Sequence, residues 1–435
     1  MTIDLTKGNI LKGLILFSLP MMLGNIMQQL YNIADTLIVG QVLGKDALAA
    51  VGSAYTLMTF LTSIFLGLAM GSGALFSIYY GKKDTEKLKS SIAHGFILIM
   101  LITIVINILV YIFIDPILVF LNTPEKLYSS MYDYLFVIFM GLIFTSIYNF
   151  IACLLRAIGN SITPLYFLIA STITNIILDL LFVITFDMGI KGAAIATVIA
   201  QFISAIGITI YFLIKCKDLT PNKFKYDKNI IKELFNLSSL TCLQQSTMNF
   251  GVLMIQRLIN SFGSIVMAGF ASAVKIDTFA YLPSQDFGNA FSTFVAQNYG
   301  ANQKERIKIG FKKAIFLTSA LGIIISIIVN IFSKDLMSIF ISKEETEVIL
   351  EGVKYLRIEG SFYVGIAILS LLYGYYRAIK KPFMSFILTV ISLGLRVLLA
   401  YSLAPYLGTS GIYISIVIGW ISADLFGLIY KKIRL

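Results

Sequence analysis

Four polar side chains share one helix face within the first long apolar stretch of the chain. They recur at spacings of three, four and three residues: Asn25, Gln28, Asn32 and Asp35. Residues with these spacings lie on the same face of an α-helix. A charged group in the middle of a bilayer costs roughly 2.5–3.5 kcal/mol, so Asp35 needs a partner or a function. We interpret Asp35 as a carrier of a proton or a cation. For the three amides, the alternative is a hydrogen-bonded seam between helices.

A second set of polar residues lies in two later apolar stretches. Asn175 and Asp179 are four residues apart. Ala193 and Thr197 repeat this spacing in the string GAAIATVIAQ, whose small residues allow helices to approach closely. With Asp35, these stretches offer carboxylate, amide and hydroxyl oxygens, which suit an alkali cation, and two carboxylates could equally share one proton. The alternative is that the two acids are packed for structure alone.

The second half of the chain differs at the position equivalent to Asp35. Leu253 stands there, within a neutral stripe of amides: Gln245, Asn249, Gln256 and Asn260. We therefore expect ion coupling to reside in the first half.

Charged residues of both signs lie in two further stretches of the second half: Lys275, Asp277, Asp286, Arg357 and Glu359. Two interpretations stay open. They form internal ion pairs that hold this half together, or the acids line a cavity that meets a cationic substrate. We expect Arg396 to neutralise one of these acids. Three charged residues near predicted span ends are interpreted as interfacial: Asp187, Arg257 and Asp424.

The elements that position these residues follow from composition. Hydrophobic residues make up 58% of the 435 residues, against about 45–50% in soluble domains, which excludes an ordinary soluble enzyme. Apolar blocks of about 20 residues or more match a hydrocarbon core of about 30 Å. They predict twelve membrane spans, at 13–40, 48–80, 92–114, 131–155, 162–187, 190–214, 233–261, 265–299, 310–332, 353–376, 383–405 and 409–430.

The basic residues orient these spans. With the N-terminus in the cytoplasm, the inner loops and ends collect 24 Lys and Arg residues and the outer loops only five. This asymmetry predicts a cytoplasmic location for both termini. Because the net charge of +11 is concentrated in short loops, we discard nucleic acid as a partner.

The cysteines and the histidine limit the chemistry further. Cys153, Cys216 and Cys242 form no CxxC pair, and His94 is the only histidine. These residues are too few and too widely spaced for a disulfide framework or a His/Cys metal site. We therefore expect no cofactor and no metal beyond a coupling ion.

The two halves of the chain repeat each other. YGKKDTEKLK, from Tyr80, aligns with YGANQKERIK, from Tyr299, at an offset of 219 residues. LLRAIGN, with Arg156, aligns with YYRAIKK, with Arg377, at an offset of 221. We predict an all-α polytopic membrane protein whose twelve transmembrane helices form two six-helix lobes, related by a pseudo-twofold axis along the membrane normal. The lobes are expected at 1–214 and 233–435, joined by a basic cytoplasmic linker at 215–232.

These strings make the chain similar to the multidrug and toxic compound extrusion (MATE) family over nearly its whole length. The resemblance rests on SLPMMLGNIMQQLYNIADTLIVG, on NIILDLLFVI followed by MGIKGAAIATVIAQ, and on the repeated YGxxxxxxxK and RAI loops. The family's coupling aspartate follows a bend-forming proline by fifteen residues, as Asp35 follows Pro20. The resemblance also implies a first-lobe cation site at Asn175, Asp179, Ala193 and Thr197. The chain departs from members that place acids in helices 7 and 10, because Gln256 or neighbouring amides stand in helix 7 and Glu359 is only an approximate match in helix 10.

The resemblance implies an antiporter that exports drugs or metabolites against inward flow of Na⁺ or protons. Its substrates would be small lipophilic or cationic molecules, and its place the bacterial cytoplasmic membrane, where it would function as a monomer. Polar residues expected near the substrate cavity are Gln28, Asn32, Asp277, Asp286 and Glu359. A lipid-linked oligosaccharide flippase is the main alternative, but it would need a basic cavity and commonly two extra spans. A membrane enzyme lacks a nucleophile–base pair or phosphate loop here, and a channel does not fit a single alternating cavity.

Overall fold

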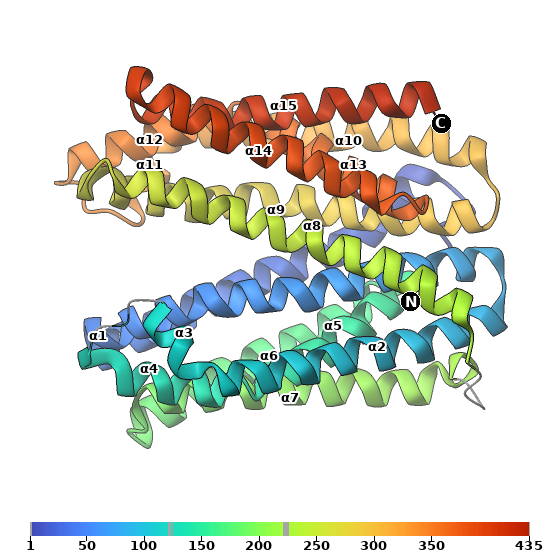
Figure 1. Ribbon diagram of the computed structural model, residues 1–435, viewed down its shortest axis with the longest axis horizontal. Coiled ribbons are helices and arrows are strands. Elements are labelled where there is room, and N and C mark those ends of the chain that lie inside the picture. Colours follow the sequence, from blue (N-terminus) through green and yellow to red (C-terminus); the bar gives the residue numbers. More distant parts are fainter. Residues whose placement is uncertain (1, 121–122, 124, 221–225, 435) are drawn as a thin grey trace. The chain divides into compact units, whose positions relative to one another are not determined.

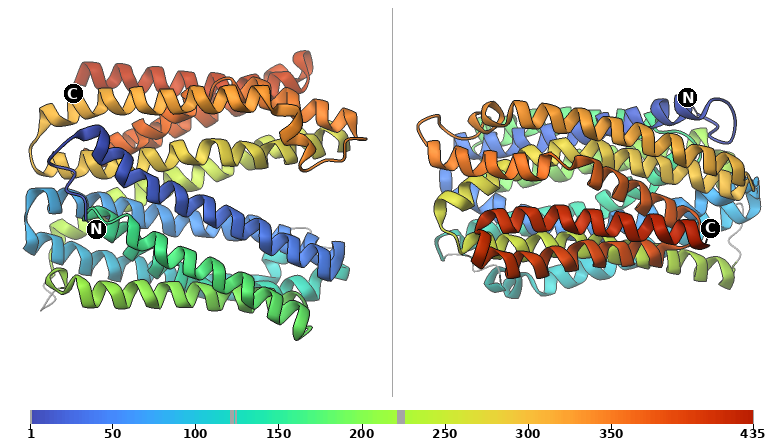
Figure 2. Two further views of the ribbon diagram at one scale, coloured as in Figure 1. Left: turned by 180° about the vertical axis from the view of Figure 1, so that it is seen from behind. Right: turned by 90° about the horizontal axis from the view of Figure 1, so that it is seen from above.

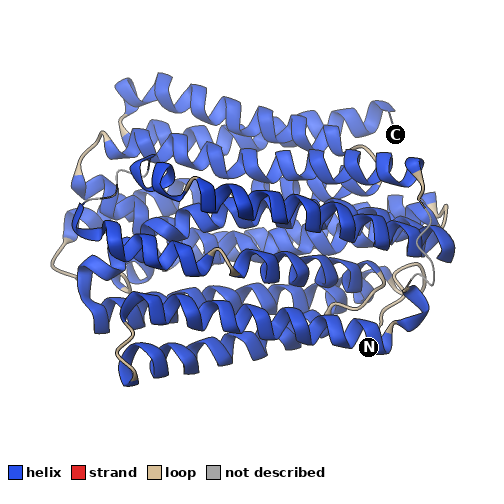
Figure 3. Ribbon diagram, turned by 60° about the horizontal axis from the view of Figure 1, so that its bottom comes forward, coloured by secondary structure: helices blue, strands red, loops and turns tan. Residues whose placement is uncertain are grey.

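The computed structural model describes residues 2–434, except 121–122, 124 and 221–225. Helices, turns and loops make up all of this described part (Figure 3). The α-helices are α1 (Ile10–Lys82), α2 (Thr85–Ile112), α3 (Ile114–Phe120), α4 (Glu125–Ile138), α5 (Gly141–Ala157), α6 (Ile162–Asp179), α7 (Gly189–Lys215), α8 (Lys228–Asn260), α9 (Ser264–Gly300), α10 (Lys304–Ile331), α11 (Ser333–Ser338), α12 (Thr346–Gly360), α13 (Tyr363–Ala378), α14 (Pro382–Leu407) and α15 (Thr409–Arg434). A π-helix, η1 (Leu180–Thr185), continues α6, and a short 3₁₀-helix, η2 (Lys217–Leu219), follows α7.

The helices that reach across a membrane match the predicted spans. Within the described residues, nine helical segments are long and apolar enough to cross, and two bent pairs raise the number to eleven. The pairs bend by 40° between α4 and α5 and by 53° between α12 and α13. The predicted span at 233–261 lies on α8, which carries the stripe of amides and is therefore less apolar.

Helix α1 contains the first two predicted spans. Its backbone departs from helical geometry at Gly44, where φ is 82° and ψ is −176°. A positive φ of this size is readily adopted by glycine alone, so the residue permits a sharp break between the spans. Pro20 lies inside the first of them, where the dihedral angles are helical. A bending role for Pro20 therefore stays a prediction.

The chain divides into two compact units. Unit 1 comprises Met1–Asp4 and Leu19–Cys242, and unit 2 comprises Leu5–Ser18 and Leu243–Leu435. The lobe boundaries expected from the repeat, with their linker at 215–232, stay a prediction, and residues 221–225 of that linker lie outside the described part.

In unit 1, α7 packs against α4, α5 and α6, which run alongside it (Figure 1). The second span of α1 lies so close to the start of α8 that a Cβ atom at Gly71 would fall 2.5 Å from the carbonyl oxygen of Leu237. Ser72 and Ser238 join the same two helices through hydroxyl groups 2.9 Å apart. Small residues thus allow the close helix contacts that membrane bundles use.

In unit 2, α14 and α15 form a long antiparallel pair, the two red helices that lie side by side in both views of Figure 2. Helix α9 packs against α12 and α13. A Cβ atom at Gly374 would fall 2.3 Å from the carbonyl oxygen of Gly288, so glycine is required where α13 crosses α9. These contacts fix α9 and α12, which carry the acids of this unit.

Candidate functional site

The first polar cluster forms where α1, α6 and α7 meet in unit 1. Ser171 of α6 donates a hydrogen bond to the carbonyl oxygen of Ala200 in α7, at 2.9 Å, and so joins these two helices. Further along, Asn175 Nδ2 donates to Thr197 Oγ1 at 3.3 Å. Tyr31 Oη of α1 lies 3.2 Å from the same hydroxyl. Thr197 is therefore the hub that connects the three helices.

Two carboxyl groups belong to this cluster. Asp35 and Asp179 lie close enough for their carboxyl groups to act on each other electrostatically. Asp179 is fully buried, and Asp35 is 9% exposed. Among the described residues, neither carboxyl has a basic group within 4.0 Å. The acids are therefore turned away from lipid and are not neutralised by an arginine or a lysine.

Several oxygens of the cluster have no hydrogen-bond donor in the structure. They are Asp35 Oδ1, Asn175 Oδ1 and both carboxyl oxygens of Asp179. A buried acceptor without a donor costs roughly 1–3 kcal/mol, and more if it is charged. A bound cation or proton would remove this cost. Carboxylate, amide and hydroxyl oxygens are also the ligands that suit a hard cation.

The backbone around the cluster is irregular at one point. Asp179 is the last residue of α6, and the π-helix η1 begins at Leu180. Such π-helical turns are rare and occur frequently at functional sites. Ala193, one turn before Thr197 on α7, is 1% exposed. A role for Ala193 through its carbonyl oxygen stays a prediction.

Two tyrosines of the cluster were not predicted from the sequence. Tyr31 lies four residues before Asp35, a spacing that could have indicated it. Tyr134 of α4 is buried and interacts with Asp35, Asp179 and Tyr31. Tyr134 stands among apolar residues of a different helix, so nothing in the sequence indicated that it would contact these acids.

The amides predicted beside Asp35 lie in less buried positions. Gln28 is exposed and Asn32 is half-buried. The carbonyl oxygen of Asn32 accepts a hydrogen bond from Thr36 Oγ1 at 2.7 Å. Neither amide side chain has a recorded contact with the carboxyl groups, so their predicted place near a substrate stays untested.

A second polar cluster forms in unit 2, between α9 and α12. Tyr355 Oη donates to Asp277 Oδ2 at 3.4 Å, and the same tyrosine interacts with Glu359. The ring of Tyr355 packs edge-on against Phe270 and Tyr413, with ring centroids 5.3 and 5.0 Å away, which fixes its hydroxyl group. Both acids are buried, Asp277 at 5% exposure and Glu359 at 2%.

Arg396 of α14 acts electrostatically on the second cluster, although among the described residues no ion pair within 4.0 Å joins it to Asp277 or Glu359. It interacts electrostatically with both Asp277 and Glu359, as predicted. Lys275 and Arg357 are exposed whereas Asp277 and Glu359 are buried, so within the described structure these two bases form no internal ion pair with the acids. Lys275 Nζ lies instead 5.8 Å from the ring of Phe340. Side chains only two residues apart point to different sides of a helix.

Two other acids of unit 2 lie apart from this cluster along their helices. Asp286 is buried on α9, nine residues beyond Asp277, or about 13 Å at 1.5 Å per residue. Asp424 of α15 is only 7% exposed, and its Oδ1 has no hydrogen-bond partner. Asp424 lies ten residues before the end of α15 at Arg434, and its interfacial location stays a prediction.

The comparisons with known proteins agree with this architecture. The family model MatE matches the chain twice, at residues 20–181 and 241–402. The two matches begin 221 residues apart, the offset of the repeat seen in the loops. They cover most of the chain.

Two bacterial proteins resemble the chain over most of its length. The chain is 30% identical to "Probable multidrug resistance protein YpnP" of Bacillus subtilis over 433 residues, which cover 99% of this chain and 96% of that protein. It is 26% identical to "Probable multidrug resistance protein NorM" of Thermotoga maritima, covering 93% and 89% of the two chains.

Solved structures share the fold. The structure described as MATE in complex with MaL6 superimposes with a TM-score of 0.94 at 23% identity, covering 100% of this chain and 98% of that one. The predicted all-α membrane fold of twelve helices in two lobes is thereby confirmed. The chain belongs to the MATE family of multidrug efflux transporters and is a multi-pass membrane protein.

Proposed function

We propose that this protein is an antiporter that uses inward flow of Na⁺ or protons to export lipophilic, often cationic compounds. It would act as a monomer in the bacterial cytoplasmic membrane, with both termini in the cytoplasm. One observation carries the proposal: Asp35 and Asp179 are buried together among neutral polar side chains, with no basic group within 4.0 Å of them in the described structure. The names of the relatives in Bacillus and Thermotoga agree with the export of drugs.

The first cluster is suited to bind the coupling ion. For Na⁺, the oxygens of Asp35, Asn175 and Asp179 would complete a shell that Thr197 begins, and all of them belong to one unit. For a proton, the two carboxyl groups would share it. Either ion would remove the repulsion between two buried negative charges. The same oxygens are therefore suited to bind either Na⁺ or a proton.

Coupling requires that the ion distinguish two states of the transporter. A ligand that binds two states equally shifts nothing between them. Asp35 lies on α1 and Asp179 on α6, so an ion held by both joins these helices, and its loss lets them separate. We propose that this change in the position of α1 is the step that alters access to the substrate.

The substrate would meet the remaining polar residues. Gln28 is exposed in the structure, whereas Asp277, Asp286 and Glu359 are buried. A cationic substrate would therefore reach these acids only in a state that opens α9 and α12. Aromatic rings beside an acid, such as Tyr355 beside Asp277, suit flat lipophilic cations through apolar contact and cation–π attraction.

Efflux from reconstituted vesicles tests the proposal. Vesicles loaded with ethidium would be given a Na⁺ gradient and a pH gradient separately, with wild-type protein, Asp35→Asn and the control Asp335→Asn. Asp335 is an exposed acid on α11, so its change removes the same charge outside the cluster. We expect one gradient to drive efflux by wild type and the control, and neither to drive it in Asp35→Asn. Gradient-driven efflux by Asp35→Asn would contradict the proposal.

A further inference from the structure

Three lysines gather at one end of unit 2, away from both polar clusters. Lys308 and Lys312 lie one turn apart near the start of α10, and Lys431 lies near the end of α15. The beginning of α10 and the end of α15 lie at the same end of the unit (Figure 1). Lys308 and Lys312 are exposed, and both act electrostatically on Lys431. The three ammonium groups therefore form one cluster of positive charge.

Two aromatic rings hold the ammonium group of Lys431 in place. Its Nζ lies 3.9 Å from the centre of the Phe311 ring and 5.6 Å from that of Tyr375. The two rings pack edge-on, with centroids 5.0 Å apart. Cation–π attraction and the half-buried stem of the lysine hold the ammonium group against this aromatic surface. The charge is thus fixed beside Lys308 and Lys312 instead of moving away from them.

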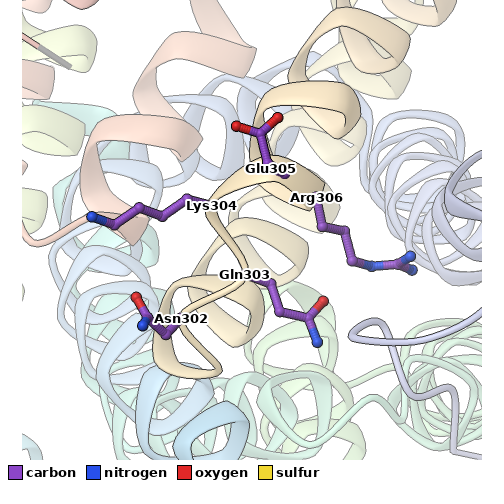
Figure 4. Close-up of a pocket in the computed structure, with 5 residues that line it drawn as sticks. All are labelled: Asn302, Gln303, Lys304, Glu305 and Arg306. Carbon is purple, nitrogen blue, oxygen red and sulfur yellow. The ribbon is translucent and has the colours of Figure 1, made fainter.

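No carboxylate of the described structure lies within 4.0 Å of these three ammonium groups. Glu305, the nearest acid before Lys308 on α10, points away from Lys304 and Arg306 in Figure 4. Arg306 is already engaged, since its guanidinium donates to the carbonyl oxygens of Leu5, Lys7 and Gly8. Like charges at this spacing repel, so the cluster gains stability from an anion that it holds.

The position of the three lysines indicates which kind of anion they bind. Lys304–Ile331 and Thr409–Ile433 are membrane spans, so lysines near their ends lie at the level of lipid headgroups. The same helices expose large apolar side chains toward their surroundings, among them Phe316 at 73% and Ile429 at 55% exposure. Basic pockets between transmembrane helices bind the headgroups of anionic lipids. We propose that Lys308, Lys312 and Lys431 bind the phosphate group of an anionic phospholipid, whose acyl chains lie along α10 and α15.

Lipid binding to the full-length protein tests this site. Native mass spectrometry would count molecules of phosphatidylglycerol bound to protein in detergent, with phosphatidylcholine as the neutral competitor. The test variant carries Lys308→Gln, Lys312→Gln and Lys431→Gln. The control carries Lys82→Gln, Lys83→Gln and Lys89→Gln, which remove the same charge from the loop that the repeat places in the equivalent position of unit 1.

We expect the test variant to bind phosphatidylglycerol at least about 10-fold more weakly, since each lysine near a lipid surface contributes about 1 kcal/mol. The control should retain its affinity within about 2-fold. A variant with three Lys→Arg changes at the same positions should bind like wild type. Thermal unfolding shows whether each variant is folded. Equal losses in test and control, or full competition by millimolar inorganic phosphate, would overturn the proposal.

Discussion

Two buried pairs of acids, one in each unit, differ in how their charge is compensated. Among the described residues, Asp35 and Asp179 in unit 1 have no basic group within 4.0 Å, and Asn175 and Tyr134 are neutral side chains that act on them. Asp277 and Glu359 in unit 2 face tyrosine hydroxyls and also Arg396. The second cluster therefore lies near a basic side chain of the protein itself, whereas the first, on the proposed function, would take its cation from solution.

This difference supports the proposal that ion coupling resides in unit 1. Arginine stays protonated at physiological pH, so a positive charge lies near the acids of the second cluster in every state of the transporter. The charge of the first cluster changes whenever an ion binds or departs. Only a reversible occupant can shift an equilibrium between two states.

The largest expected effect is a loss of ion-driven efflux when one acid of the first pair is neutralised, with no such loss for the second pair. Asp179→Asn should lower ion-driven efflux by about 10- to 100-fold, the range of a coupling energy of 1–3 kcal/mol. Asp277→Asn should leave the dependence on the ion gradient intact, because Arg396 and not a dissolved ion compensates that carboxyl. Initial efflux rates at several Na⁺ concentrations and pH values would measure both. If Asp277→Asn abolished ion dependence as well, the contrast between the clusters would be wrong.

A smaller effect is expected from removing the fixed cation. Arg396→Gln leaves Asp277 and Glu359 without compensation. Breaking a fully buried pair costs 3–5 kcal/mol, and since the guanidinium is only half-buried we expect a loss of roughly 2 kcal/mol in unfolding free energy. The combination Arg396→Gln with Glu359→Gln should recover most of that loss. Denaturant unfolding in detergent measures it, and an equal loss in the double variant would show that packing and not charge is responsible.

Hydropathy predicted the spans well because each is a long run of apolar residues. Even α8, which its amides make less apolar, was found from its length and breakers. The end of α15 was not, since hydropathy falls at Lys431 while the helix continues to Arg434.

Spacing within a helix predicted which polar residues share a face, and Asn175 does lie with Asp179 in the first cluster. It could not predict which helices meet. The contact between Tyr31 and Thr197 joins residues 166 positions apart, and Tyr134 reaches the acids from yet another helix. Such contacts depend on how helices pack, which leaves no periodic signal along the chain. The same limit applies to Arg396, whose two acidic partners lie on α9 and α12.

The tyrosine hydroxyls sharpen the comparison further. Tyr31→Phe removes the hydroxyl that lies 3.2 Å from Thr197 Oγ1 and leaves the ring in place. A hydrogen bond of this kind contributes about 1 kcal/mol, so we expect about 5-fold weaker binding of the coupling ion. Tyr355→Phe, the matched change in unit 2, should leave ion binding unchanged. The ion concentration for half-maximal efflux measures both, and equal shifts in the two variants would contradict separate roles for the clusters.

The smallest effect on transport is expected at Asp424, a buried acid that belongs to neither pair. Its carboxyl has no partner on Oδ1, and Tyr373 of α13 is the polar side chain on which it acts electrostatically. Because it lacks the second acid and the amide that make the first cluster a cation site, Asp424→Asn should keep ion-driven efflux within about 2-fold of wild type. Asp424→Leu should raise the free energy of unfolding by about 1 kcal/mol, since an unsatisfied buried polar group is replaced by an apolar one. Efflux assays and denaturant unfolding measure these effects. A loss of ion-driven efflux in Asp424→Asn would mean that a single buried acid suffices for coupling, and that the pairing of Asp35 with Asp179 is not what distinguishes unit 1.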